Sequence, residues 1–179
     1  LEKSKKYNIS AIDFSYGDGG GHSSSSRRTI DASVDLDLNT WYNLAIVVRG
    51  ATDMSLYLDG VELINPNYSG TGGNVQFSSG SPFLLARYKS FWEGNTWTYK
   101  KCSVNDVTLW NIELPQHEIQ NYMNCPPTGT ESGLVGYWNF EEGTGTTAYD
   151  QTANGNNGTI NGATYDTNVP PSCGLTNAN

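Results

Sequence analysis

Residues 41–60 limit the possible folds more than any other part of the chain, because they predict a β-hairpin. Two runs of alternating apolar side chains, WYNLAIVVRG (41–50) and MSLYLDG (54–60), flank a short polar turn. The pair Asp59-Gly60 is a tight-turn signal. We interpret Trp41 and Tyr57 as core residues of this hairpin. It carries no nucleophile, acid–base pair or metal cluster, so it predicts a fold rather than an activity.

Further alternating or apolar runs predict the other strands. They are YNISAIDF (7–14), RTIDASVDL (28–36), PFLLARY (82–88), CSVNDVTLW (102–110) and LVGYWNFEE (134–142). Residues 65–80 and 89–99 are predicted as a long polar loop and an aromatic-rich connection. LPQHEIQNYM (114–123) predicts a helix, because proline suits a first turn and Ile119, Tyr122 and Met123 share a face. The sequence thus predicts an all-β chain with one short helix near residues 115–124.

Size and charge exclude several classes of protein. The chain has 179 residues, enough for one all-β domain with a sizeable core. A net charge of −8 argues against a nucleic-acid partner, since phosphate binding needs a basic face. No run approaches the roughly 20 apolar residues of a spanning helix, so no membrane insertion is expected.

The hairpin and the segment VNDVTLWNIELPQHEI (104–119) resemble laminin-G-like modules of the concanavalin A-like lectin/glucanase superfamily. The matching positions in the second segment are Asp106, Trp110, Asn111, Leu114, Glu118 and Ile119. The resemblance implies an antiparallel β-sandwich of the jelly-roll type. It also implies a secreted or cell-surface protein that binds a glycan or a cell-surface protein.

The C-terminal segment 134–165 resembles the opening of the same kind of domain, although it follows the closing helix. We expect residues 1–125 to form the sandwich core and residues 126–173 to complete it with further strands. The alternative is that the segment starts a second repeat beside neighbouring domains of a longer chain. Residues 174–179 are expected to be a disordered tail. The CPPTG and VPPSC punctuation resembles surface proteins of Bacteroidetes exported by type IX secretion.

A ligand site is predicted in the aromatic-rich connection and the residues just before it. Aromatic rings can stack on the apolar face of a sugar, while charged and polar side chains bond its hydroxyls. The candidate residues are Arg87, Tyr88, Trp92, Glu93, Trp97 and Tyr99. The competing interpretation is that these rings cover a sheet edge.

A structural Ca²⁺ site is predicted in the loop after residue 149, since closely spaced oxygen donors beside glycine suit this ion. The candidate ligands are Asp150, Asn154, Asn156 and Asn157, with further charge available from Asp106, Glu141 or Glu142. The alternative is an Asn/Gly turn that bonds its own backbone.

Cys125 and Cys173 both lie beside Pro-Pro and bracket the C-terminal segment, so a disulfide between them is predicted. The competing pair is Cys102 with Cys125, which the spacing does not exclude.

The sequence as a whole predicts a non-catalytic, lectin-like binding or adhesion module. The retaining glycosidases of the resembled superfamily need two nearby carboxylates on one face, and no such strand motif is present. Glu141 and Glu142 are adjacent, so they would point to opposite faces of a strand. A spacer or assembly repeat without a ligand is the other interpretation.

Overall fold

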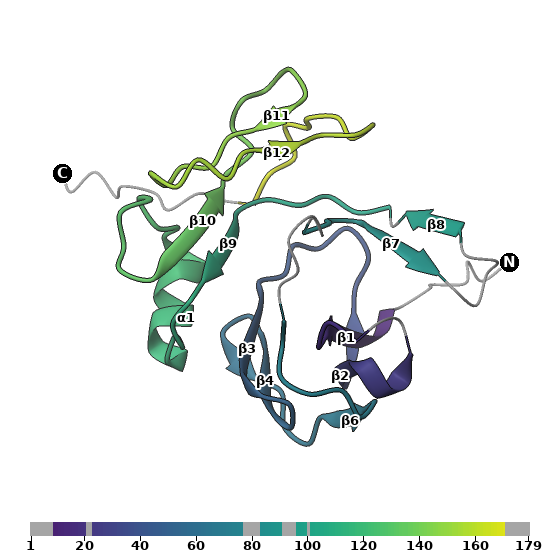
Figure 1. The fold of residues 1–179 in the computed structure, drawn as a ribbon. Coiled ribbons are helices and arrows are strands. Elements are labelled where there is room, and N and C mark those ends of the chain that lie inside the picture. Colours follow the sequence, from purple (N-terminus) through teal and green to yellow (C-terminus); the bar gives the residue numbers. More distant parts are fainter. Residues whose placement is uncertain (1–8, 21–22, 77–82, 91–95, 100, 171–179) are drawn as a thin grey trace, which may run out of the picture.

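The computed structural model describes residues 9–20, 23–76, 83–90, 96–99 and 101–170. These residues form an antiparallel β-sandwich with one helix (Figure 1). Every strand pair within them is antiparallel. No helix in the described part of the chain is long and apolar enough to cross a membrane.

Two three-stranded sheets face each other at the centre of the sandwich. One sheet has the order β1-β2-β6 and consists of β1 (Ile9–Gly17), β2 (Arg27–Leu36) and β6 (Asn67–Ser69); a short 3-10 helix, Ser24–Ser26, precedes β2. The other has the order β3-β4-β5 and consists of β3 (Leu44–Gly50), β4 (Asp53–Leu58) and β5 (Val61–Glu62).

The main core lies between these sheets because alternate residues of each strand point inward. Ile30 and Leu56, from opposite sheets, are both fully buried. Around them pack Ile12, Tyr16, Ala32, Leu36 and Met54. The predicted alternation in β2 is therefore confirmed.

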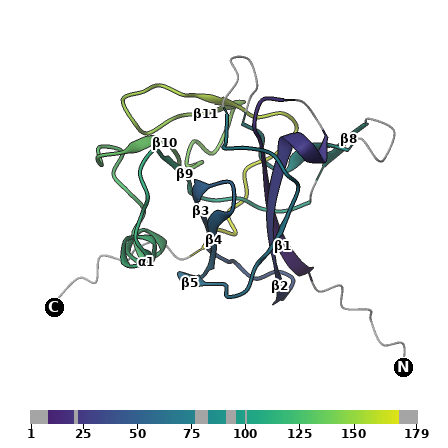
Figure 2. The ribbon, with the colours of Figure 1, turned by 60° about the horizontal axis from the view of Figure 1, so that its bottom comes forward.

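The opposite face of β3-β4 is covered by helix α1 (Gln116–Asn124). Ile119 of the helix packs on Val47 and Tyr57, with Ala45 and Leu114 beside them. Figure 2 shows the resulting order of layers, with β3 and β4 between α1 and β1-β2. The predicted helix and the core role of Tyr57 are confirmed, and the helix begins directly after Pro115.

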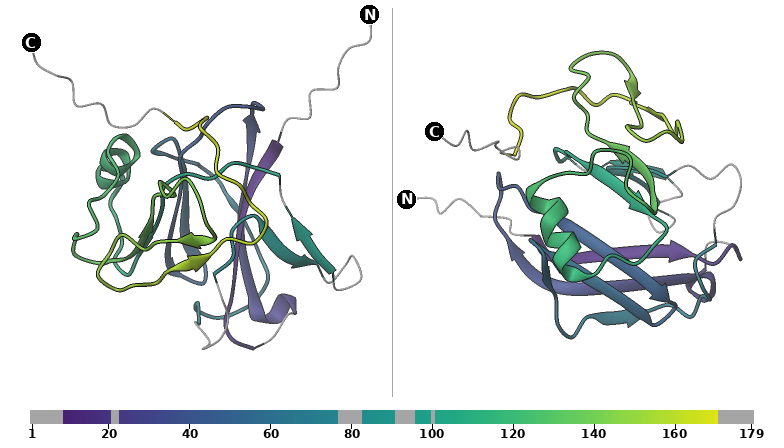
Figure 3. Two further views of the ribbon diagram at one scale, coloured as in Figure 1. Left: turned by 90° about the horizontal axis from the view of Figure 1, so that it is seen from above. Right: turned by 90° about the vertical axis from the view of Figure 1, so that its left-hand side faces the viewer.

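A second, smaller layer contains β9 (Val107–Trp110), β10 (Leu134–Trp138), β11 (Thr147–Ala148) and β12 (Gly158–Thr159). β10 pairs with β9, and β11 pairs with β12. The β11-β12 segment lies beyond β9-β10, on the side away from β1-β2 (Figure 3). The C-terminal segment thus pairs through β10 with a strand of the predicted core. The division into core and extension, or into two repeats, stays a prediction.

Two parts of the strand prediction are wrong. The apolar run PFLLARY predicts a buried strand, but Phe83, Leu84 and Leu85 lie outside any strand and are exposed. The apolar composition of this run favours burial, but the rest of the described structure leaves these side chains exposed. Conversely, β6 lies inside the predicted loop 65–80, and β8 (Thr96–Tyr99) lies inside the predicted connection 89–99. Each of these short strands is defined by its pairing partner, which the local sequence does not reveal.

Candidate ligand-binding surface

Four of the six predicted ligand residues lie in a two-stranded ribbon formed by β7 (Arg87–Ser90) and β8 (Thr96–Tyr99). The strands pair with each other and, within the described residues, with no third strand. Figure 1 shows the ribbon at the side of the molecule remote from α1. The ribbon is therefore an accessory element attached to the sandwich.

The register of the ribbon decides which candidate positions share a face. Arg87 is opposite Tyr99, and Lys89 is opposite Trp97. Opposed positions, and positions two apart along a strand, lie on the same face of a ladder. These four positions therefore fall on one face.

Three of the six predicted ligand residues, Arg87, Trp97 and Tyr99, are thus brought together. Tyr88 occupies a position on the opposite face, while Trp92 and Glu93 lie outside the described residues. Lys89 is not among the ligand residues predicted from the sequence. Its period-two spacing from Arg87 would have indicated it if residues 87–90 had been paired correctly with residues 96–99.

The four predicted calcium ligands also lie close together, in a loop that we call the Asp150 loop (residues 150–157). The Asp150 carboxylate accepts four hydrogen bonds. Its Oδ1 accepts the N–H groups of Tyr137 (3.0 Å) and Thr152 (2.9 Å). Its Oδ2 accepts the Thr152 hydroxyl (2.9 Å) and the Asn156 N–H (2.9 Å).

The three asparagines of this loop are also engaged. The side-chain amides of Asn154 and Asn156 each donate to the Val135 carbonyl at 2.9 Å. The Asn157 side-chain oxygen accepts the Asp150 N–H at 3.0 Å. Burial raises the pKa of the Asp150 carboxyl. The backbone N–H groups of Thr152, Tyr137 and Asn156 outweigh burial, so the pKa lies below the ordinary value.

This donor set does not fit a calcium ion as the loop is folded. Each Asp150 oxygen already accepts two hydrogen bonds, and two of the asparagines turn their nitrogens to a carbonyl instead of offering oxygens. The described residues contain no group of three or more His, Cys, Asp or Glu side chains that could hold a metal. The arrangement favours the turn interpretation, and calcium stays an untested prediction.

Two of the three acidic residues proposed as extra ligands, Glu142 and Asp106, are bonded elsewhere. Glu142 accepts the Tyr149 N–H (2.7 Å) and the Tyr165 hydroxyl (3.0 Å). Asp106 accepts the Tyr137 hydroxyl at 2.8 Å, which joins the start of β9 to β10. Burial raises the pKa of Asp106, and the bond from Tyr137 opposes this only in part. Asp106 therefore acts as a structural contact between the core and the C-terminal segment.

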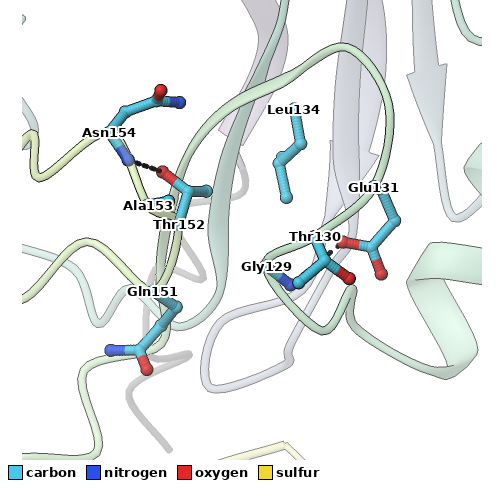
Figure 4. A pocket seen from close by; sticks show the side chains of 8 residues that line it. All are labelled: Gly129, Thr130, Glu131, Leu134, Gln151, Thr152, Ala153 and Asn154. Atoms are coloured by element: carbon cyan, nitrogen blue, oxygen red, sulfur yellow. Dashed lines mark hydrogen bonds between the residues drawn. The ribbon is translucent and has the colours of Figure 1, made fainter.

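A shallow pocket of about 590 Å³ separates the turn at residues 128–131 from the Asp150 loop (Figure 4). Leu134 and Ala153 give it an apolar part, and Glu131, Gln151 and Asn154 give it a polar part. The sequence analysis did not find this pocket. The only signal was the Thr128-x-x-Glu131 spacing, which has the form of a capping box.

Glu131 organises the wall of this pocket. Its carboxylate accepts the N–H groups of Thr128 (2.7 Å) and Gly129 (3.0 Å) and the Thr128 hydroxyl (2.9 Å). Burial raises the pKa of Glu131, but these donors outweigh it and leave the pKa below the ordinary value. The carboxylate is thus committed to the turn.

The structure answers part of the cysteine prediction. Cys102 is a free, exposed thiol, so the alternative pair Cys102–Cys125 is not formed. Cys173 lies outside the described residues, and the Cys125–Cys173 disulfide stays a prediction.

The fold and this surface define an all-β sandwich domain with an accessory ribbon. The family model described as Concanavalin A-like lectin/glucanases superfamily (Laminin_G_3) matches residues 7–120. The match covers more than half of the chain, so the protein belongs to this superfamily. No curated protein and no solved structure matches the chain.

Proposed function

We propose that this domain is a non-catalytic binding module of a secreted or cell-surface protein, and that it binds a glycan through one face of the β7-β8 ribbon. The observation that carries the proposal is the register of the ribbon. It places Arg87 and Lys89 beside Trp97 and Tyr99, four positions from two separate stretches of sequence.

This combination of residue types suits a sugar. Tryptophan and tyrosine rings offer flat apolar surfaces that can stack on a pyranose face. Arginine and lysine provide hydrogen-bond donors for hydroxyl or carboxylate groups at its edge. Although the domain carries a net charge of −8, two basic positions on one small ribbon favour an acidic sugar over a neutral one locally.

Membership of the superfamily supports binding in general and leaves catalysis open, since the superfamily contains lectins and glucanases. The proposal of a non-catalytic role depends on the sequence. Retaining glycosidases need two carboxylates about 5–5.5 Å apart, and the sequence contains no E-x-x-x-E spacing. A spacer or assembly repeat without a ligand is the second candidate. The observation that favours this second candidate is that β10 joins the C-terminal segment to the core by β-pairing.

A glycan array probed with the intact protein, with and without EDTA, tests the proposal. Trp97→Ala should weaken binding to any positive glycan by about 1–3 kcal/mol, the loss typical of an aromatic anchor. Its melting temperature should change little, because the ribbon is an accessory element. Loss of binding in EDTA would add calcium to the proposal.

Tyr149→Ala is the matched control, since Tyr149 is an exposed aromatic residue that does not belong to the ribbon. It should leave binding unchanged. If Trp97→Ala lowers stability strongly and leaves binding intact, the ribbon is part of the core and the spacer interpretation is favoured. An array without any positive glycan would count against the proposed ligand.

A further inference from the structure

Four hydrogen bonds of the Asp150 loop reach the edge of β10 that is not paired with β9. Tyr137 directs both main-chain groups to this loop. Its N–H donates to the Asp150 carboxylate (3.0 Å), and its C=O accepts the Gln151 N–H (2.7 Å). The Val135 C=O accepts both the Asn154 and Asn156 amides.

These contacts imitate a neighbouring strand. A strand added at this edge would exchange N–H and C=O groups with alternate residues of β10. The Asp150 carboxylate takes the place of a main-chain carbonyl, and the two asparagine amides take the place of main-chain N–H groups. The Trp138 indole N–H also donates to the Asn156 carbonyl (2.9 Å), which fixes the loop alongside the strand.

We propose that the Asp150 loop is an edge cap that closes β10 to strand addition, and that without the cap β10 pairs with β10 of a second copy of this chain. An uncovered edge presents free N–H and C=O groups that template pairing with another chain. β10 has the sequence LVGYW, which contains strand-forming residues, no charge and no proline. None of the residue types that normally protect an edge is present in the strand itself.

A second copy is the occupant that the strand favours. Antiparallel self-pairing of β10 would extend the β9-β10 sheet to four strands about a two-fold axis, with the same residues on both sides of the contact. The loop, and not the strand, then determines whether the chain associates.

The first test is sedimentation velocity over a range of concentrations. The double variant Asn154→Ala/Asn156→Ala uncovers the Val135 carbonyl and removes two of the side-chain contacts that hold the loop on the edge. It should form a concentration-dependent dimer to a greater extent than the wild type. Asn161→Ala, an exposed asparagine of the same segment, is the matched control and should behave as the wild type.

The second test is hydrogen exchange at the Tyr137 amide, which reports the edge directly. In Asp150→Ala, exchange at low protein concentration should be faster by about tenfold or more, since the amide loses a charged acceptor. At high concentration the amide should regain protection when a second β10 pairs with it.

Three results would overturn the proposal. One is a double variant that folds and sediments like the wild type at every concentration. Another is equal association of the Asn161→Ala control, which would show a nonspecific effect. The last is failure of the double variant to fold, because the asparagines would then support the fold rather than cover an edge.

Discussion

Gly129, in the turn of residues 128–131, lies against the Asp150 loop. Its φ of +98° is a left-handed backbone conformation that favours glycine, and a Cβ built there would collide with the carbonyl oxygen of Gln151. Both the backbone angle and the close approach therefore require glycine at this position. The close contact between the turn and the loop is possible because Gly129 has no Cβ.

Gly129→Ala should therefore destabilise the protein by more than the about 1–2 kcal/mol expected for a left-handed alanine alone. Gly143→Ala is the control, because Gly143 also has positive φ (+68°) and a Cβ added to it would meet nothing within 4 Å. Urea unfolding of both variants measures the difference. Equal losses would show that the turn moves away from Gln151 at no cost.

The elements are held together by the two faces of β3-β4. One face meets β1-β2 through Met54 and Leu56, and the other meets α1 through Tyr57 and Val47. This sheet is therefore the central layer of the core. An ion pair between Arg49 of β3 and Glu113, at 2.6 Å, adds a surface contact to the segment before the helix. Such exposed pairs contribute at most about 1 kcal/mol, so packing dominates.

Leu56→Ala should lower the free energy of unfolding by about 2–5 kcal/mol, since Leu56 is 0% exposed and its removal leaves a cavity. Leu44→Ala, in the neighbouring strand, is the control. Leu44 is 46% exposed, so its truncation should cost about 0.5 kcal/mol. Chemical denaturation compares the two. A small loss for Leu56→Ala would mean that the sheets close over the space.

At the scale of the whole molecule, the C-terminal segment is linked to the core by β10, by the Asp106–Tyr137 hydrogen bond and by the bond from the Asn111 N–H to the Gly133 carbonyl (2.9 Å). Tyr137 is buried by these contacts. We therefore expect the segment and the core to unfold as one cooperative unit.

Deleting residues 126–179 should abolish the cooperative unfolding transition of the remainder. The deletion removes the strand partner of β9 and exposes its edge. Calorimetry of the truncated and intact proteins measures this. A truncated protein that melts at the same temperature as the intact one would show instead that residues 126–179 belong to a separate unit.

Stability should fall steeply in acid. The backbone N–H groups of Gly73 and Gly20 lower the pKa of Asp18, and hydrogen bonds also hold the pKa values of Glu131 and Asp150 below their ordinary values. A lowered folded-state pKa stabilises the fold above the unfolded pKa of about 4, and this stabilisation is lost as the pH falls through the folded value.

The pKa of Asp106 is shifted in the opposite direction, so its effect on stability has the opposite pH dependence. Its raised pKa gives a stabilising contribution that is fully present below the ordinary pKa of an aspartate and is lost as the pH rises through the folded value. Three lowered groups against one raised group predict a melting temperature that declines below about pH 4. Melting scans from pH 7 to pH 2 measure the decline, and Glu131→Gln should make it shallower. A flat profile would contradict the prediction.

The sequence by itself determined the all-β class, the hairpin of β3 and β4, the inward face of β2 and the short helix. These features depend on local periodicity and turn residues, which can be recognised within a short stretch of sequence. It also indicated a superfamily through residues 104–119 and the hairpin, and the family match agrees.

Only the tertiary structure decided the pairing of strands. Three findings depend on residues distant in sequence or on packing that is absent. They are the register that places Arg87 opposite Tyr99, the exposure of Phe83, and the role of Asp150 as the partner of Tyr137. The cluster of Asp and Asn that suggested a metal site has the chemistry to meet a cation or the edge of a strand. Here the Asp150 carboxylate accepts the Tyr137 N–H, and the Asn154 and Asn156 amides donate to the Val135 carbonyl. The position of β10 beside the loop determines which of these two partners, cation or strand edge, the side chains bind.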